Sequence, residues 1–213
     1  MIARTDVTAI VLAGGRASRF GGDKLHAELS GMSLLDRAIT AVAEVAEEVV
    51  IAGPARPSWR ALPGTSIRSV VDAEPFAGPL AALAGALSTA HGSLAIVVGG
   101  DMPALVPAVL ELLLQRVAPD IAGTMPVEAA ILAAQEPGAK RQVLPLAIHV
   151  AAGWAAAGAA LAAGDRSLVR VLDRLATVEI RAAEWLALDP AGRTLVDVDA
   201  PADLDRLRDG EFR

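Results

Sequence analysis

Apolar residues occur along this chain as short unbroken runs that alternate with longer stretches of helical spacing. Unbroken runs bounded by Gly or Pro are typical of strands that are buried on both faces. These runs cover residues 7–12, 48–52, 67–71 and 94–98. Residues 34–47 and 79–90, which lie between them, are predicted to be helices. The β-α-β-α order predicts an α/β fold, a Rossmann-like, mainly parallel sheet flanked by helices on both faces.

The second half of the chain continues the alternation with shorter runs. Further strands are predicted at residues 143–150 and 177–180, and further helices at residues 107–117, 167–175 and 201–208. The last helix would begin with Pro201, a residue type favoured at the first helical position. No internal repeat or low-complexity linker interrupts the pattern, so residues 1–213 are predicted to form a single domain.

Residues 150–164 carry no charge and raise the question of a membrane segment. A helix needs about 20 strongly apolar residues to cross a bilayer, whereas this stretch is shorter and consists mostly of Ala and Gly. We therefore predict a packed helix here and no membrane partner. The N-terminus also lacks the basic start and the small-residue cleavage site of a signal peptide, which favours a cytoplasmic protein.

Composition excludes several classes of function. The chain has 213 residues, of which 54% are hydrophobic, so it can bury a sizeable core. It has no Cys, which excludes disulfides, thiolate zinc sites and cysteine nucleophiles. The formal net charge is -6, no block of Lys or Arg occurs, and aromatic residues are 3%, which together argue against a nucleic acid partner.

The turn after the first predicted strand carries the strongest chemical signal. Residues 12–24 (LAGGRASRFGGDK) place two Gly pairs and three cations, Arg16, Arg19 and Lys24, within one short loop. Backbone N–H groups of such a loop, together with the cations, can bind a triphosphate. The spacing excludes a P-loop, because Asp23 precedes Lys24 and Leu25 follows it, and the turn does not contain the dinucleotide fingerprint G-x-G-x-x-G. A tight turn with solvated basic residues is the alternative.

A second candidate follows the strand predicted at residues 94–98, where the sequence reads Gly99-Gly100-Asp101. Ligands bind at the carboxyl ends of strands in open α/β sheets. Mg²⁺ needs one or two carboxylates and takes its other ligands from phosphate and water, so Asp101 suits this ion. A helix cap is the alternative role for this Asp.

The loop sequence LAGGRASRFGGDK resembles the signature L-x-G-G-x-S-x-R-x-G-x-D-K of nucleotidyltransferases, and of molybdenum cofactor guanylyltransferases in particular. Ala17 replaces a frequent Ser. The resemblance implies a fold of the nucleotide-diphospho-sugar transferase type, with Arg19, Lys24 and Asp101 as catalytic residues. It implies nucleotide contacts from Leu12, Ala13, Gly14, Gly15, Lys24, Asp72 and Asp101.

Two weaker motifs extend the resemblance from about residue 7 to residue 207. Asp72 begins a segment similar to the family element D-x-x-P-x-x-G-P-L. Residues 195–204 (LVDVDAPADL) resemble the closing segment N/D-x-N/D-T-P-x-D-L, with Asp197 and Asp199 where Asn is common. Asp199 is interpreted either as a second metal ligand or as a helix cap before Pro201.

The resemblance implies transfer of GMP from Mg²⁺-bound GTP to molybdopterin-bound molybdenum, with molybdoenzyme maturation proteins as further partners. In this family Gly at the position of Gly14 goes with guanine, and Ala goes with cytosine. An attacking phosphate is largely ionised at pH 7, since its second pKa is about 6, so no general base is needed. Lys140, Arg141 and Arg166 are candidates for the acceptor phosphate, with a solvated surface as the alternative.

Two other functions are compatible with the sequence. A cytidylyltransferase of the same fold would use CTP with molybdopterin or another small phosphate ester. A nucleotide-binding module without catalysis could instead serve a cofactor-insertion protein, although the presence of both Lys24 and Asp101 argues for activity.

Overall fold

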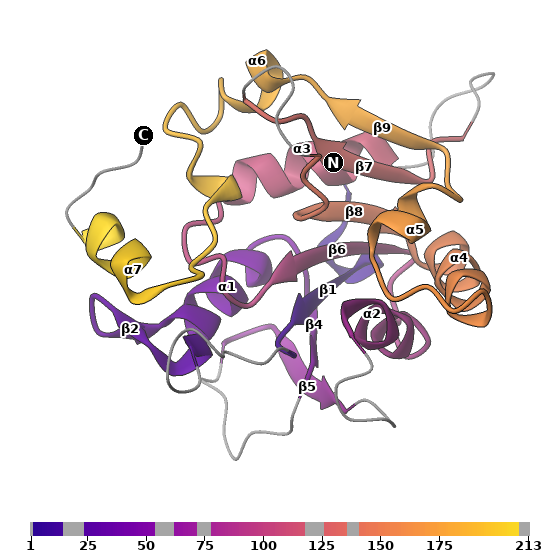
Figure 1. Cartoon of the computed structure of the whole chain (residues 1–213), viewed down its shortest axis with the longest axis horizontal. Coiled ribbons are helices and arrows are strands. Elements are labelled where there is room, and N and C mark those ends of the chain that lie inside the picture. The colour runs from indigo at the N-terminus through magenta and orange to yellow at the C-terminus, as the bar shows by residue number, and fades with distance from the viewer. Residues whose placement is uncertain are drawn as a thin grey trace.

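Seven strands form one sheet in a computed structural model that describes residues 2–14, 24–53, 62–71, 78–117, 126–135 and 141–208. Their order across the sheet is β5-β4-β1-β6-β8-β7-β9 (Figure 1). The strands are β1 (Val7–Leu12), β4 (Glu48–Ala52), β5 (Ser66–Val70), β6 (Leu94–Gly99), β7 (Ala129–Leu132), β8 (Leu146–His149) and β9 (Thr177–Ile180). A separate two-stranded hairpin consists of β2 (Glu28–Leu29) and β3 (Met32–Ser33).

The sheet is mainly parallel, as the sequence predicts. β1 pairs in parallel with β4 and with β6, and β4 pairs in parallel with β5. The exception is β8, which runs antiparallel to both β6 and β7, while β7 and β9 are parallel to each other. The carboxyl ends of β1, β4, β5 and β6 therefore meet at one edge, which is the edge where ligands bind in open α/β sheets.

Helices cover both faces of the sheet. They are α1 (Leu34–Ala43), α2 (Pro79–Leu87), α3 (Pro107–Val117), α4 (Val150–Ala162), α5 (Val169–Leu172), α6 (Ala182–Trp185) and α7 (Pro201–Arg208). Short 3-10 turns are η1 (Arg4–Asp6), η2 (Lys24–His26) and η3 (Arg193–Leu195). α1 and α3 pack on one face, and α2, α4 and α5 pack on the other.

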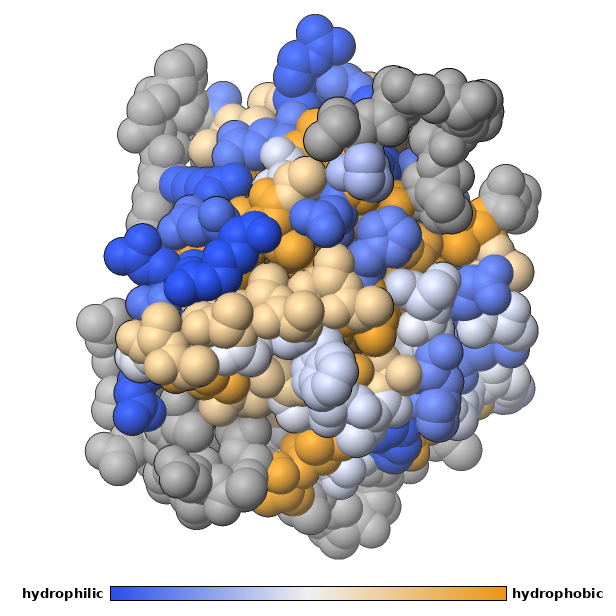
Figure 2. All heavy atoms as spheres, turned by 90° about the vertical axis from the view of Figure 1, so that its right-hand side faces the viewer, coloured by the Kyte–Doolittle hydropathy of each residue, from blue (hydrophilic) through white to orange (hydrophobic). Residues whose placement is uncertain are grey.

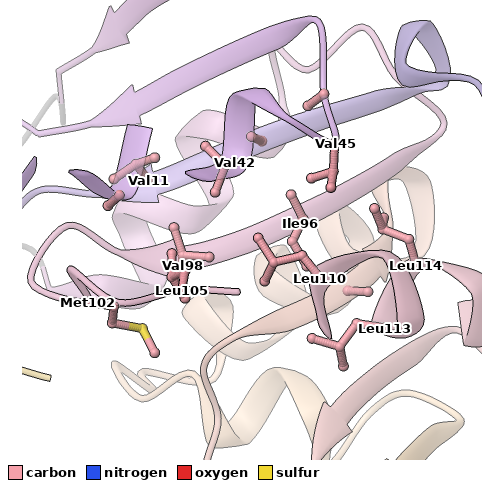
Figure 3. Packing of buried hydrophobic residues seen from close by; sticks show 14 of the residues in the cluster. Val11, Val42, Val45, Ile96, Val98, Met102, Leu105, Leu110, Leu113 and Leu114 are labelled. Carbon is pink, nitrogen blue, oxygen red and sulfur yellow. The ribbon is translucent and has the colours of Figure 1, made fainter. Parts of the chain in front are cut away.

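Each strand supplies both faces because successive side chains point in opposite directions. Val11 of β1 packs with α1 and α3, whereas its neighbour Ile10 packs with α2. Figure 3 shows the first of these cores, in which Val11 and Ile96 of the sheet meet Val42 of α1 and Leu110 of α3. Leu110 is fully buried, and such burial stabilises the fold by about 1.5–3 kcal/mol per side chain.

Several helices are shorter than their hydrophobic pattern indicates. The helix predicted at residues 34–47 ends at Ala43, where the guanidinium of Arg4 donates hydrogen bonds to the carbonyls of Ala43 and Ala46 at 2.6 Å and 3.2 Å. These bonds satisfy carbonyl groups that the helix end leaves free. The helices predicted at residues 79–90 and 167–175 are α2 and the four-residue α5, and the strand predicted at 143–150 is β8 alone.

The uncharged segment is α4, a helix packed against α2. Its outward positions are Ala, Gly and Trp residues, and Figure 2 shows a pale apolar band across this side of the molecule. Among the described residues, none of the helices combines the length and the apolar character that crossing a membrane requires.

Candidate functional site

The ends of three strands bring together those predicted nucleotide-binding residues that the structure describes. The N–H group of Ala13 donates to the carbonyl of Ala52 at 2.8 Å, so β1 and β4 stay paired just beyond their ends. On the other side, the N–H group of Gly100 donates to the carbonyl of Leu12 at 2.9 Å. The segment containing Leu12, Ala13 and Gly14 therefore lies directly beside the segment that leads to Asp101.

Lys24 and Asp101 form an ion pair at this edge, although they are 77 positions apart in the sequence. The Nζ atom of Lys24 lies 2.7 Å from Oδ2 of Asp101. The same Nζ lies 3.2 Å from Oδ1 of Asp199 and donates to the carbonyl of Val198 at 3.0 Å. Two residues that the sequence assigns to the phosphates and the metal are thus in contact, and the C-terminal segment joins them.

A tight backbone arrangement positions Asp101. The N–H group of Val198 donates to the backbone carbonyl of Asp101 at 3.0 Å, which fixes the C-terminal segment against the turn. Gly99 has no side chain to oppose this geometry, since a Cβ atom there would lie 2.4 Å from Oδ1 of Asp101. A larger residue at position 99 would therefore displace the carboxylate.

The side chain of Asp199 faces Lys24, while the side chain of Asp203 in α7 forms hydrogen bonds with the backbone just before this helix. The carboxylate of Asp203 accepts hydrogen bonds from the N–H groups of Asp199 and Ala200, at 3.0 Å and 2.8 Å. α7 lies beside the β2 hairpin, which follows Lys24 in the chain (Figure 1). This packing keeps the two ends of the site together.

Negative charge exceeds positive charge among the described residues of this cluster. Burial lowers the pKa of Lys24, but hydrogen bonds and charge attraction from Asp101 and Asp199 outweigh it, so the pKa lies above its ordinary 10.5. The pKa of Asp197 also lies above its ordinary value, because the chain partly desolvates this carboxyl and both Asp199 and Asp101 repel its charge. The cluster therefore favours a further cation.

The carboxylates of this cluster suit Mg²⁺ as one partner among several. Among the described residues, no group of three or more His, Cys, Asp or Glu side chains is placed to hold a metal ion unaided. Mg²⁺ does not require such a group, because it takes one or two carboxylates and completes its shell with phosphate and water. The ammonium of Lys24 already lies between Asp101 and Asp199, so this position accepts positive charge.

Other predicted residues fall outside the structural description or outside the cluster. Gly15, Arg19, Asp72 and Lys140 lie outside the described residues, so their roles stay predictions. Arg141, a candidate for the acceptor, lies 2.8 Å from Oε1 of Glu179 through its Nε atom, within a surface ion pair.

Two contributors were not predicted as site residues. The carbonyl of Val198 binds Lys24, and no side-chain pattern could have indicated a backbone acceptor. Asp197 is a further carboxylate whose shifted pKa depends on Asp199 and Asp101. Only its place in the motif DVDA distinguished it in the sequence.

Comparisons with known proteins identify the family of this chain. Residues 9–179 match the family described as MobA-like NTP transferase domain. A protein from Chloroflexus aggregans named "Probable molybdenum cofactor guanylyltransferase" is 30% identical over 201 residues, which cover 93% of this chain and 91% of that protein. A protein of the same name from Natronomonas pharaonis is 30% identical over 208 residues, covering 95% of this chain and 96% of that protein.

A solved structure shows the same fold. It is titled molybdopterin-guanine dinucleotide biosynthesis protein A, from Archaeoglobus fulgidus, and it superimposes with a TM-score of 0.71. The match covers 95% of this chain and 97% of that one, at 20% sequence identity.

The family match and the named relatives identify the chain as an enzyme of the nucleotidyltransferase class. More particularly, the chain belongs to the MobA-like NTP transferase family.

Proposed function

We propose that this enzyme transfers GMP from Mg²⁺-bound GTP to molybdopterin-bound molybdenum, releasing pyrophosphate and forming the guanine dinucleotide cofactor. The observation that carries the proposal is that the carboxylates of Asp101 and Asp199 both lie within 3.2 Å of the ammonium nitrogen of Lys24. Relatives that match nearly the full chain are named molybdenum cofactor guanylyltransferases, which supports this choice of acceptor. We place the reaction in the cytoplasm, as the sequence predicts.

The chemistry consists of binding and charge neutralisation. The acceptor phosphate is largely ionised at pH 7 and attacks the α-phosphate of GTP without a general base. Asp101, with Asp199 beside it, would hold Mg²⁺, which neutralises the phosphate oxygens when bound. Lys24 would stabilise the negative charge that accumulates as pyrophosphate leaves. Arg19 and Asp72 complete the proposed nucleotide site.

Gly14 supports guanine as the base. Among the described residues, a Cβ atom at Gly14 would meet only the carbonyl of Ala52, at 4.0 Å. Its φ angle also lies outside the positive range that favours glycine. Neither packing nor backbone conformation in the described protein therefore requires Gly here. We infer that Gly14 is needed instead for the nucleotide base, which would lie beside it.

A nucleotide screen tests the proposal. GTP, CTP, ATP and UTP would each be titrated with Mg²⁺ by calorimetry, and pyrophosphate release would then be measured with molybdopterin. We expect GTP to bind most tightly and to release pyrophosphate only when the acceptor is present. Preference for CTP would identify a cytidylyltransferase instead, and GTP binding without release would identify a non-catalytic nucleotide-binding protein.

A further inference from the structure

All three hydrogens of the Lys24 ammonium have acceptors within the protein. They are Oδ2 of Asp101 at 2.7 Å, the carbonyl of Val198 at 3.0 Å and Oδ1 of Asp199 at 3.2 Å. An ammonium group has three N–H donors and no acceptor. In this arrangement Lys24 has no donor left for a phosphate, and it occupies one oxygen of each carboxylate that the proposed function assigns to Mg²⁺.

While Lys24 keeps these partners it cannot donate to the phosphates as the proposed function requires, and its positive charge opposes the binding of Mg²⁺ to the same carboxylates. We propose that Lys24 is an internal cation, which holds Asp101 and Asp199 together in the free enzyme and which a divalent cation displaces when it binds these carboxylates. This inference rests on the proposed function and describes the regulation of the same site. After the exchange, Mg²⁺ binds the carboxylates and the ammonium is free to bind the phosphates.

Charge balance favours replacement of the Lys24 ammonium by another cation over its departure from the carboxylates without a replacement. Asp101, Asp197 and Asp199 lie within electrostatic reach of one another, and Lys24 is the one cation the described residues place among them. Moving Lys24 away without a replacement would leave three like charges close together, which is unfavourable. Mg²⁺ brings two positive charges to the carboxylates, so the ammonium can leave without uncovering them.

The lysine can move while its surroundings stay fixed. Its flexible four-carbon stem can redirect the ammonium without movement of the backbone. The C-terminal segment has its own attachment, the hydrogen bond from the N–H group of Val198 to the carbonyl of Asp101. Displacement of Lys24 therefore leaves Asp199 close to Asp101, where both can bind the incoming ion.

Removal of the Lys24 ammonium should affect metal affinity and turnover in opposite directions. Because the ammonium competes with the metal, removing it should tighten metal binding to the free enzyme while it lowers turnover. Mn²⁺, observed by electron paramagnetic resonance without nucleotide, is the probe. We expect Lys24→Met to bind Mn²⁺ about fivefold or more tightly than the unaltered enzyme, in keeping with coupling between two ligands of one site.

A matched control removes an equal charge elsewhere. Arg116 pairs with Glu184 on the surface, so Arg116→Met should leave Mn²⁺ affinity unchanged. Equal or weaker Mn²⁺ binding by folded Lys24→Met would overturn the exchange. Such a result would leave the proposed function standing if GTP still releases pyrophosphate. Tighter Mn²⁺ binding by Lys24→Met, with no pyrophosphate release by the unaltered enzyme, would instead support the exchange and contradict the proposed function.

A second measurement uses the unaltered chain and does not depend on the folding of a variant. The sequence contains two lysines, Lys24 and Lys140, so Lys140 serves as an internal control for acetylation followed by mass spectrometry. Mg²⁺ alone should raise the acetylation rate of Lys24 several-fold relative to Lys140, because the displaced amine loses its carboxylate partners. Addition of GTP should then protect it. An unchanged ratio on saturation with Mg²⁺ would overturn the exchange.

Discussion

Carboxylates at the amino ends and at the carboxyl ends of the parallel strands have different partners. At the amino edge, Glu48 begins β4 opposite Thr8 of β1, and its carboxylate accepts hydrogen bonds from the hydroxyl of Thr8 at 2.6 Å and the N–H group of His91 at 3.0 Å. Arg68 donates to the same carboxylate from two nitrogens, at 3.1 Å and 3.0 Å. At the carboxyl edge, Lys24 is shared between Asp101 and Asp199.

The pKa values of Glu48 at the amino edge and Asp197 at the carboxyl edge shift in opposite directions. Burial raises the pKa of Glu48, but Thr8, His91 and Arg68 outweigh burial, and the pKa lies below its ordinary 4.5. The pKa of Asp197 lies above its ordinary value, because partial burial and the negative charges of Asp199 and Asp101 oppose its ionisation. The comparison teaches that Glu48 has several donors of its own within the protein, whereas Asp101 and Asp199 share one ammonium and Asp197 lies close to both.

The largest expected effect is on turnover at the carboxyl edge. Asp101→Asn should keep the fold but lower pyrophosphate release by roughly 10²-fold or more, because an amide cannot neutralise Mg²⁺. Asp199→Asn should lose less. Single-turnover assays of both variants, with circular dichroism to check folding, measure this. Near-normal turnover of Asp101→Asn would remove the residue from the mechanism.

At the amino edge the expected effect is on stability. Glu48→Gln should lower the free energy of unfolding by about 2 kcal/mol, since hydrogen bonds to a buried charged group are lost. The melting temperature of a chain of this size would then fall by roughly 4–8 °C. Turnover per folded molecule should be unchanged, and a loss of turnover greater than the loss of folded protein would break the comparison.

The loss of stability in Glu48→Gln should depend on pH. A carboxyl with a lowered pKa in the folded state stabilises the fold above its unfolded pKa, and that stability is lost as the pH falls through the folded pKa. The difference in stability between the unaltered protein and Glu48→Gln should therefore be full above about pH 4.5 and shrink below it. Chemical denaturation from pH 7 to pH 3 measures this, and a constant difference would contradict the role of the charge.

Gly14 sharpens the comparison with a smaller effect. Gly14→Ala should leave stability unchanged or slightly raised, because a Cβ atom has room beside Ala52 and alanine reduces the freedom of the unfolded chain. GTP turnover should fall roughly tenfold more than CTP turnover, the scale for one methyl group in a binding pocket. Equal losses for both nucleotides would mean that Gly14 serves the turn alone.

The smallest expected effect is at Asp197. Asp197→Asn removes a charge that Asp101 and Asp199 repel, so the free energy of unfolding at pH 7 should rise, by less than about 0.5 kcal/mol because the residue is exposed to water. Since its pKa is raised in the folded state, this gain should disappear as the pH falls through that value. Denaturant titration of both proteins measures it, and a clear loss of stability at pH 7 would show that Asp197 has partners like those of Glu48.

The sequence predicts the fold well where local pattern and tertiary packing agree. β1, β4, β9, α3 and α7 begin and end at the predicted residues, since Gly, Pro or a change of spacing bounds each of them. β7 was not predicted, because Ala129–Leu132 is four residues long, half alanine, and alanine has little strand propensity. Its neighbours β8 and β9 hold it in the sheet through long-range pairing.

The sequence predicted the individual residues of the site, but it did not predict the contacts between them. Strand ends placed Leu12 and Asp101 at one edge, because parallel strands share their carboxyl side. That the ammonium of Lys24 contacts Asp101, Asp199 and the carbonyl of Val198 follows from how the C-terminal segment crosses the turn. No local pattern in the sequence encodes that crossing.

The central claim is that Lys24 acts in nucleotidyl transfer, and Lys24→Ala tests it most directly. Calorimetry would measure the affinity for Mg²⁺-bound GTP, and single-turnover pyrophosphate release would measure chemistry in the same preparations. We predict a loss in kcat of roughly 10²-fold or more, the scale for removal of one preorganised stabilising donor, with a smaller loss of GTP affinity. If Lys24→Ala binds and turns over GTP like the unaltered enzyme, the account is contradicted.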